Sequence, residues 1–124
     1  MRTGEIGIQA KLHSSGLWIT VPLEVVGFGE LTMVFDSGSP MSAISPEIRA
    51  RLGGRGVVGE TAKPSTYRLT GLTAEGQSLP DLDVRVMPRL TRLQINGLIG
   101  LNYLGIFESI CFDVPTLRLT LKLR

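Results

Sequence analysis

The sequence predicts a single, mostly β domain with about seven or eight short strands and two short helices. Its 124 residues suffice for one core of ordinary size, so residues 1–124 are expected to form one domain. The composition, 43% hydrophobic and 19% charged, is typical of globular proteins. The 15 glycines and 7 prolines, spread along the chain, favour short strands joined by tight turns over a helical bundle.

Hydrophobic patterning predicts where the strands lie. Apolar residues alternate with others over residues 6–12, and four leucines alternate with polar residues over 117–123, as in strands with one buried face. Residues 31–35 are almost all apolar, which indicates a strand buried on both faces, and this strand ends at Asp36. Further strands are expected at residues 17–26, 67–72, 82–87, 93–99 and 110–114.

Capping signals predict two short helices. Ser45 suits the N-cap, Pro46 suits the first helical position, and Gly53 suits the end of a helix over 46–52. Asn102 is expected to cap a second helix over 103–107.

Charge and composition argue against several functions. The net charge of +2 is small and the basic residues are not interleaved with aromatic ones, so nucleic-acid binding is not expected. No apolar stretch approaches the ~20 residues that span a bilayer, and no signal peptide is recognisable, so we expect a soluble protein without membrane contact, in a compartment that the sequence leaves open. Cys111 is expected to be buried and His13 to lie at the surface. One cysteine and one histidine predict no disulfide, metal site or cofactor.

Asp36 is the candidate catalytic residue. A carboxylate delivered to the end of a buried strand needs hydrogen-bond donors, and Ser37, Gly38 and Ser39 can supply hydroxyls and a close backbone. Asp-Ser-Gly is also an ordinary turn sequence. The apolar run before Asp36 favours a functional acid, because turn aspartates usually lie at the surface.

A second signal follows downstream, at Leu98-Ile99-Gly100. Alone it indicates only a buried strand that ends at a packing glycine before a helix. Between the two signals the strands at 67–72 and 82–87 predict a hairpin, whose turn contains Ala74, Glu75 and Gly76.

Taken in this order, these segments resemble the retropepsin-like aspartic proteases. Val34-Phe35-Asp36-Ser37-Gly38-Ser39 is similar to the family's catalytic motif, and Leu98-Ile99-Gly100 is similar to its second element. The hairpin resembles the family's flap, and residues 110–113 and 117–121 resemble its closing strands. The resemblance covers about residues 17–123. It implies a small closed, barrel-like β domain that forms half of an acid protease.

The resemblance also implies a mechanism. Two carboxylates share one proton and activate a water molecule against a peptide bond. Because the chain has one Asp-Ser-Gly, the second carboxylate would be Asp36 of another copy in a homodimer. Ser37 would bond across the interface and Ser39 would bond the carboxylate, giving an acidic activity optimum. Residues 74–76 would cover an extended, mostly apolar peptide substrate.

The family pattern is not matched throughout. Ser37 replaces the commoner threonine but keeps the hydroxyl, and Pro40 stands where retroviral enzymes carry a substrate-binding acid. Two other functions stay open. One is a non-catalytic dimeric β domain of the same fold that binds peptides or partner proteins. The other is a carboxylate-pair glycosidase, for which the sequence offers no second acid.

Overall fold

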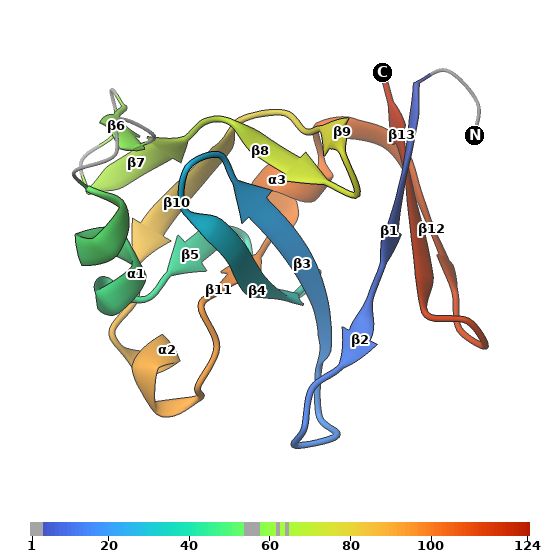
Figure 1. Cartoon of the computed structure of the whole chain (residues 1–124), viewed down its shortest axis with the longest axis horizontal. Helices are drawn as coiled ribbons and strands as arrows, with labels where there is room; N and C mark the ends of the chain where they lie inside the picture. Colours follow the sequence, from blue (N-terminus) through green and yellow to red (C-terminus); the bar gives the residue numbers. More distant parts are fainter. Residues whose placement is uncertain (1–3, 54–57, 62, 64) are drawn as a thin grey trace.

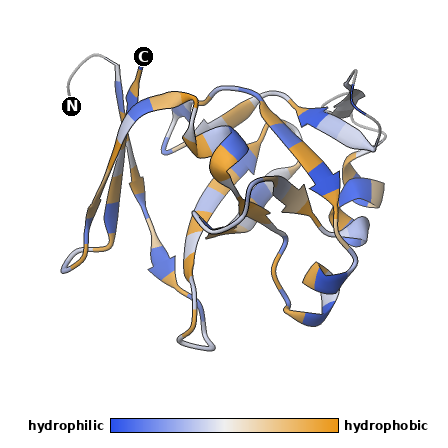
Figure 2. Ribbon diagram, turned by 180° about the vertical axis from the view of Figure 1, so that it is seen from behind, coloured by the Kyte–Doolittle hydropathy of each residue, from blue (hydrophilic) through white to orange (hydrophobic). Residues whose placement is uncertain are grey.

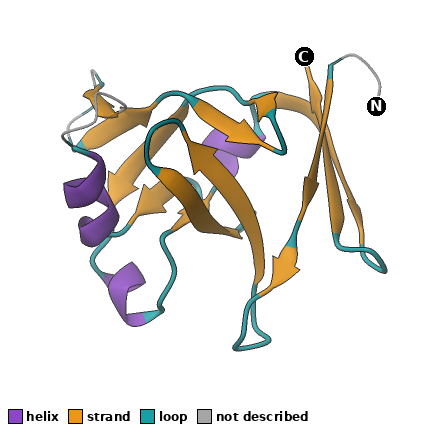
Figure 3. Ribbon diagram, viewed as in Figure 1, coloured by secondary structure: helices purple, strands orange, loops and turns teal. Residues whose placement is uncertain are grey.

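The computed structural model describes residues 4–53, 58–61, 63 and 65–124. In this part of the chain, strands dominate and the three helices are short (Figures 1 and 3). The strands are β1 (Glu5–Gln9), β2 (Lys11–Leu12), β3 (Ile19–Val25), β4 (Gly29–Phe35), β5 (Ser42–Ile44), β6 (Val58–Glu60), β7 (Thr66–Leu69), β8 (Leu72–Ala74), β9 (Gln77–Ser78), β10 (Leu82–Val86), β11 (Gly97–Ile99), β12 (Phe107–Asp113) and β13 (Arg118–Leu123). The helices are α1 (Pro46–Leu52), α2 (Arg89–Arg92) and α3 (Leu101–Leu104).

Two sheets contain all the described strands. The larger has ten strands in the order β6-β7-β10-β5-β11-β4-β3-β8-β9, with β2 paired to β3, and it curls on itself. The smaller has the order β1-β13-β12 and lies to the right in Figure 1. Hydrophobic and hydrophilic residues alternate along many strands (Figure 2), so that one face of each can enter the core.

The parallel pair of β4 and β11 lies at the centre of the larger sheet. Its register sets Val34 beside Leu98 and Phe35 beside Ile99. Met33 and Ile99 belong to the main buried cluster, whereas Val34 and Leu98 belong to a smaller cluster on the other face. The predicted two-sided burial of the strand before Asp36 is therefore confirmed for its last residues, 33–35, whereas Thr32 is exposed.

The first predicted helix is confirmed and the second is corrected. Helix α1 spans residues 46–52, and the hydroxyl of Ser45 accepts a hydrogen bond from the Ile48 N–H at 3.2 Å. Helix α3 begins after Gly100, not after Asn102, and ends at Leu104. Asn102 therefore lies inside the helix, with its side chain free to bind another element.

The strand predicted at 93–99 is shorter in the structure. Only residues 97–99 form a strand, and α2 and a turn precede it. Gln94 has a φ of 55°, in the left-handed region that interrupts an extended chain. The apolar pattern arises because Leu90, Ile95 and Leu98 all contribute to the smaller buried cluster from different local structures.

Two predictions about single residues need comment. Cys111 is exposed on β12, opposite Thr120 of β13, so its predicted burial is wrong. Strand β12 is an edge of the three-stranded sheet, where one face stays in solvent. His13 is half-buried, with its ring centroid 5.3 Å from that of Trp18.

The predicted hairpin between residues 67 and 87 divides into two parts. Strands β7 and β10 pair with each other, but the chain between them forms a smaller hairpin from β8 and β9. Strand β8 also pairs with β3, which carries this small hairpin toward β1. No helix among the described residues has the length and hydropathy to cross a membrane.

Candidate active site

The backbone of Asp36 extends the central pair of parallel strands. Its N–H donates to the carbonyl of Ile99 at 2.9 Å, and its carbonyl accepts from the Ser39 N–H at 3.2 Å. The first bond continues the pairing of β4 with β11, and the second closes a turn directly after β4. Asp36 is thus fixed where the carboxyl ends of two neighbouring strands meet.

Asp36 is half-buried, and its carboxylate has one hydrogen-bond donor among the described residues. Its Oδ1 accepts a hydrogen bond from the N–H of Gly38 at 3.0 Å. None of the three ion pairs in the described part of the chain involves it. A carboxylate without a cationic partner can accept a proton or activate a bound water molecule.

Two serines flank Gly38, and they differ in their bonding. The hydroxyl of Ser39 donates to the Met41 carbonyl at 2.7 Å, so it supports the loop instead of donating to the Asp36 carboxylate as expected. Ser37 is exposed, and its hydroxyl has no hydrogen bond to a described residue. The donor to the carboxylate is therefore the backbone of Gly38, which the sequence indicated only as a flexible position.

Gly100 packs directly against the loop that carries Asp36. A Cβ at this position would lie 2.6 Å from the Met41 carbonyl oxygen and 2.7 Å from that of Ser39. The next residue, Leu101, donates its N–H to the same Ser39 oxygen at 2.8 Å. Leu98 and Ile99 belong to strand β11, and Gly100 lets the backbone that follows lie close to the Asp36 loop. The segment Leu98-Ile99-Gly100 therefore holds this loop in place.

A buried polar network, which sequence reasoning missed, supports the same loop from behind. Ser42, fully buried, donates its hydroxyl to Asn102 Oδ1 at 2.8 Å and its N–H to the same oxygen at 2.7 Å. The Ser42 hydroxyl accepts from the Gly100 N–H at 2.9 Å, and Asn102 Nδ2 donates to the Asp83 carbonyl at 2.8 Å. The sequence offers one signal for this network: Ser42 stands among apolar residues, and a buried serine hydroxyl needs hydrogen-bond partners.

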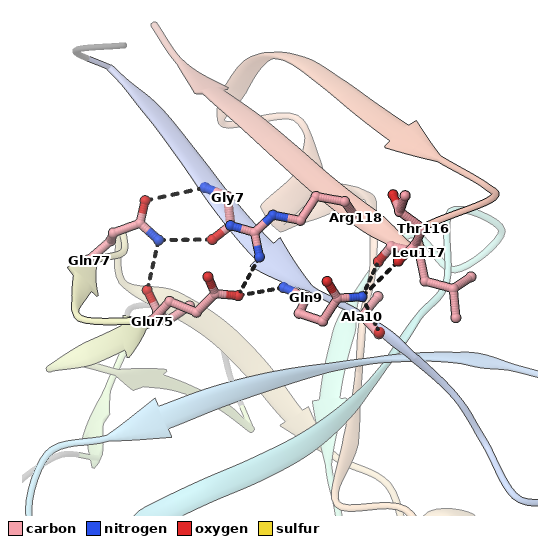
Figure 4. Close-up of polar contacts among 9 residues, drawn as sticks. Gly7, Gln9, Ala10, Glu75, Gln77, Thr116, Leu117 and Arg118 are labelled. Carbon is pink, nitrogen blue, oxygen red and sulfur yellow. Dashed lines mark hydrogen bonds and ion pairs between the residues drawn. The ribbon is translucent and has the colours of Figure 1, made fainter. Parts of the chain in front are cut away.

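The predicted flap tip is bonded to the chain's own first and last strands. Figure 4 shows Glu75 accepting from the Gln9 N–H at 2.6 Å and from Arg118 Nη1 at 2.8 Å. The amide of Gln77 pairs with the backbone of Gly7, through bonds of 3.2 and 2.8 Å. Ala74 is buried. The described contacts therefore tie this hairpin to β1 and β13, and none joins residues 74–76 to the Asp36 loop.

Gly7 allows the ion pair at this hairpin to form. A Cβ on Gly7 would lie 2.6 Å from Arg118 Nη2, because the guanidinium crosses β1 at that point to reach Glu75. We call the group formed by Gly7, Gln9, Glu75, Gln77 and Arg118 the hairpin clasp. It joins the β8–β9 hairpin of the larger sheet to the three-stranded sheet.

An apolar hollow opens on the face of the sheet that carries the Asp36 side chain. Side chains alternate along a strand, so Val34 and Asp36 point to one side, and Leu98, paired with Val34, shares it. The hollow has a volume of about 440 Å³. Its lining residues are Met87, Arg89, Leu90, Arg92, Leu93 and Leu98.

A second, polar hollow of about 310 Å³ begins at Met41, just beyond the same loop. Arg68 and Asp83 form an ion pair across it, with 2.8 Å between Nε and Oδ1. The hydrogen bond from Arg68 lowers the pKa of Asp83. Burial raises the pKa of Tyr103, whose hydroxyl donates to the Pro80 carbonyl at 2.8 Å. The Asp83 carboxylate and the Tyr103 hydroxyl are therefore engaged in structural bonds.

The described residues contain no group of three or more histidine, cysteine, aspartate or glutamate side chains that could hold a metal ion. Among the described residues, the site offers the Asp36 carboxylate, bonded to the Gly38 N–H, on the face of the sheet that also bears the apolar hollow.

No family model and no curated protein matches the chain. Its structure is similar to the crystal structure of a retropepsin-like aspartic protease from Rickettsia conorii, with a TM-score of 0.61 and 20% sequence identity. The match covers 97% of this chain and 90% of the other. The protein therefore has the retropepsin-like fold, and the fold class predicted from the sequence is confirmed.

Proposed function

We propose that the protein is an aspartic endopeptidase that works as a homodimer, with Asp36 of each chain in one shared site. The observation that carries the proposal is the Asp36 carboxylate, bonded to the Gly38 N–H and to no cation in the described part of the chain, within a retropepsin-like fold. The similar protein from Rickettsia conorii is described as an aspartic protease, which supports the same general function here.

The need for a second chain follows from the single Asp-Ser-Gly motif in the sequence. Peptide hydrolysis by carboxylates requires two of them sharing one proton, one as general base toward water and one as general acid toward the carbonyl oxygen. Glu75 is bonded to Arg118 and Asp83 to Arg68, so neither is open as Asp36 is. A twofold axis that brings two Asp36 side chains together supplies the pair.

The residues around Asp36 would hold this pair in position. The Gly38 N–H donates to the carboxylate and so orients it within the loop. Ser37, exposed and without a described partner, is suited to bond across the interface. Ser39 and Gly100 hold the loop against α3. The substrate would be an extended peptide with an apolar side chain in the hollow at Leu98.

We assign the tip of the β8–β9 hairpin a structural role instead of the role of a flap. Ala74 is buried, and Glu75 is bonded to both β1 and β13. Gly76 has a φ of 76°, which the tight turn requires. These residues would reach a substrate only after the hairpin clasp had opened.

The proposal is tested by hydrolysis of an unstructured protein between about pH 3 and pH 8, with Asp36→Asn as the inactive variant. We expect an acidic optimum, inhibition by a statine-type peptide, and a loss of at least about a hundredfold in Asp36→Asn. Asp113→Asn is the matched control, because Asp113 is exposed and bonds only Thr116 among the described side chains. Activity that survives in Asp36→Asn would overturn the assignment. Peptide binding without hydrolysis at any pH would instead favour a non-catalytic binding domain.

A further inference from the structure

The segment that lines the apolar hollow carries only positively charged residues among its charged side chains. Residues 84–107 contain no aspartate or glutamate and three arginines, Arg85, Arg89 and Arg92. Arg89 and Arg92 line the hollow and are exposed. The chain as a whole has 13 basic and 11 acidic residues, so this stretch concentrates positive charge that the rest of the protein balances.

Neither lining arginine has an acidic partner in the described part of the chain. The ion pairs there are Arg68–Asp83, Arg118–Glu75 and Lys122–Glu108. Glu47 does contact α2, but its Oε2 accepts from the Thr91 hydroxyl at 2.7 Å. The only hydrogen bond described for Arg89 is a long one, 3.9 Å from Nη2 to the sulfur of Met87. The two guanidinium groups therefore keep most of their donors for a ligand.

Arg85 adds a third positive charge on the same face of the sheet. Cross-strand register aligns Val34, Leu98, Ala43 and Arg85 in one row through β4, β11, β5 and β10. Residues opposite one another on neighbouring strands project to the same side, and this is the side of Asp36. The face beside the candidate catalytic carboxylate thus combines an apolar floor with a basic border.

We propose that the arginines beside the hollow select the substrate. The protein prefers peptides that have an apolar residue next to the scissile bond and an aspartate or glutamate within a few positions of it. The apolar side chain occupies the hollow, and the carboxylate binds Arg89 or Arg92 through charge-assisted hydrogen bonds. Opposite charges that meet across an interface determine specificity and association rate more than total affinity. This preference rests on the proposed peptidase function and adds a substrate class to it.

The test compares two peptides that differ only in glutamate or glutamine near an apolar cleavage position. At about pH 6 and low salt, where glutamate is ionised, we expect kcat/KM to favour the glutamate peptide by about fivefold, the size of one or two partly exposed ion pairs. The ratio should fall toward one at about pH 3.5, as glutamate protonates, and at about 1 M salt, which screens the pairs. The glutamate-to-glutamine ratio cancels the pH dependence of the catalytic pair itself.

Variants assign the preference to the hollow. The double variant Arg89→Gln, Arg92→Gln should hydrolyse both peptides at equal rates. Lys122→Gln removes one positive charge away from the hollow and serves as a control, because Lys122 is exposed on the three-stranded sheet and pairs with Glu108; it should keep the preference. Calorimetry at about pH 6 measures the binding of both peptides to Asp36→Asn, and the ratio of the two dissociation constants gives the same preference without catalysis.

The outcomes separate this inference from the proposed function. Hydrolysis with equal rates for both peptides overturns the acidic preference and leaves the peptidase intact. If the double variant still prefers the glutamate peptide, the acidic residue is recognised elsewhere on the protein, and the role of Arg89 and Arg92 is overturned. Absence of hydrolysis by the wild type, with equal or absent binding by Asp36→Asn, overturns both.

Discussion

Asp36 and Glu75 are both acids in tight turns that contain a glycine, but their carboxylates have different partners. Asp36 has a backbone fixed by Ile99 and Ser39 and a carboxylate with one described donor, the Gly38 N–H. Glu75 has a carboxylate bonded to Arg118 and to the Gln9 N–H. A turn sequence alone therefore does not show whether its acid has a catalytic or a structural role. The hydrogen-bond and ion-pair partners of the carboxylate distinguish the two roles.

The two turns also differ in what holds them. The Asp36 loop is fixed by close backbone packing at Gly100 and by the buried bonds of Ser42 and Asn102. The hairpin clasp consists of half-exposed polar groups, and its ion pair joins side chains that are about 40% exposed. Buried, close-packed contacts tolerate little change, whereas exposed ion pairs contribute little to stability. Substitutions should therefore damage the first turn far more than the second.

The largest effect is expected for Gly100→Ala. The added methyl would lie within 2.7 Å of two backbone oxygens, neither of which can move without displacing the Asp36 loop. We expect a loss of about 3 kcal/mol in the free energy of unfolding, measured by chemical denaturation, and loss of most activity. Gly59→Ala is the control, because a Cβ at Gly59 meets nothing within 4 Å. Equal stability of the two variants would contradict the close packing of Gly100.

Asn102→Ala should have the next largest effect. It leaves the buried N–H and hydroxyl of Ser42 without their shared acceptor, which costs about 2 kcal/mol of folding free energy. Asn96→Ala removes an amide that accepts from the Thr32 N–H in an exposed position, and it should cost clearly less. A loss for Asn102→Ala no larger than that for Asn96→Ala would show that the network does not stabilise the loop.

Breaking the hairpin clasp should cost about 1 kcal/mol or less. Glu75→Gln and Arg118→Gln each remove an exposed ion pair, and a double-mutant cycle of thermal unfolding measures their coupling. If the hairpin is structural, kcat/KM should stay close to that of the wild type. A large fall in kcat/KM with unchanged stability would restore the role of residues 74–76 as a substrate-contacting flap.

The smallest effect concerns the acid Asp83. Because Arg68 lowers its pKa in the folded protein, protonation favours the unfolded state. The stability that this pair contributes is present above the unfolded pKa of about 4 and is lost as pH falls through the lower folded value. Wild-type protein should therefore lose stability relative to Asp83→Asn between about pH 5 and pH 2 in denaturation curves. Parallel curves would show that the ion pair contributes nothing measurable.

Much of the fold could be predicted because its signals are local. The apolar run of residues 31–35 and the capping signals of α1 correctly specify a buried strand and a helix. The predicted strand at 93–99 is longer than the observed one. Leu90 in a helix and Leu98 in a strand enter the same buried cluster, and the sequence does not distinguish these two kinds of local structure. Cys111 was misplaced because an edge strand exposes one face that its apolar neighbours do not reveal.

The candidate site was predictable only in outline. The motif around Asp36 and the glycine at 100 indicated which segments meet, since each has a distinctive local sequence. The bonds from Asn102 to Ser42 and from Glu75 to Arg118 join residues 43 or more positions apart, and no local pattern predicts them. The sequence therefore indicated two acidic turns, and only the long-range contacts distinguish them.

The claim that Asp36 is half of a site shared by two chains is tested most directly by mixing. A fixed amount of wild-type protein is allowed to exchange subunits with increasing amounts of Asp36→Asn, and hydrolysis is followed at the acidic optimum. Because mixed dimers carry one catalytic carboxylate, activity should fall as the variant is added, to about half at an equimolar ratio, as random pairing requires. Activity that stays constant, with mixed dimers shown by mass spectrometry, would mean that each chain carries a complete site and would contradict the account.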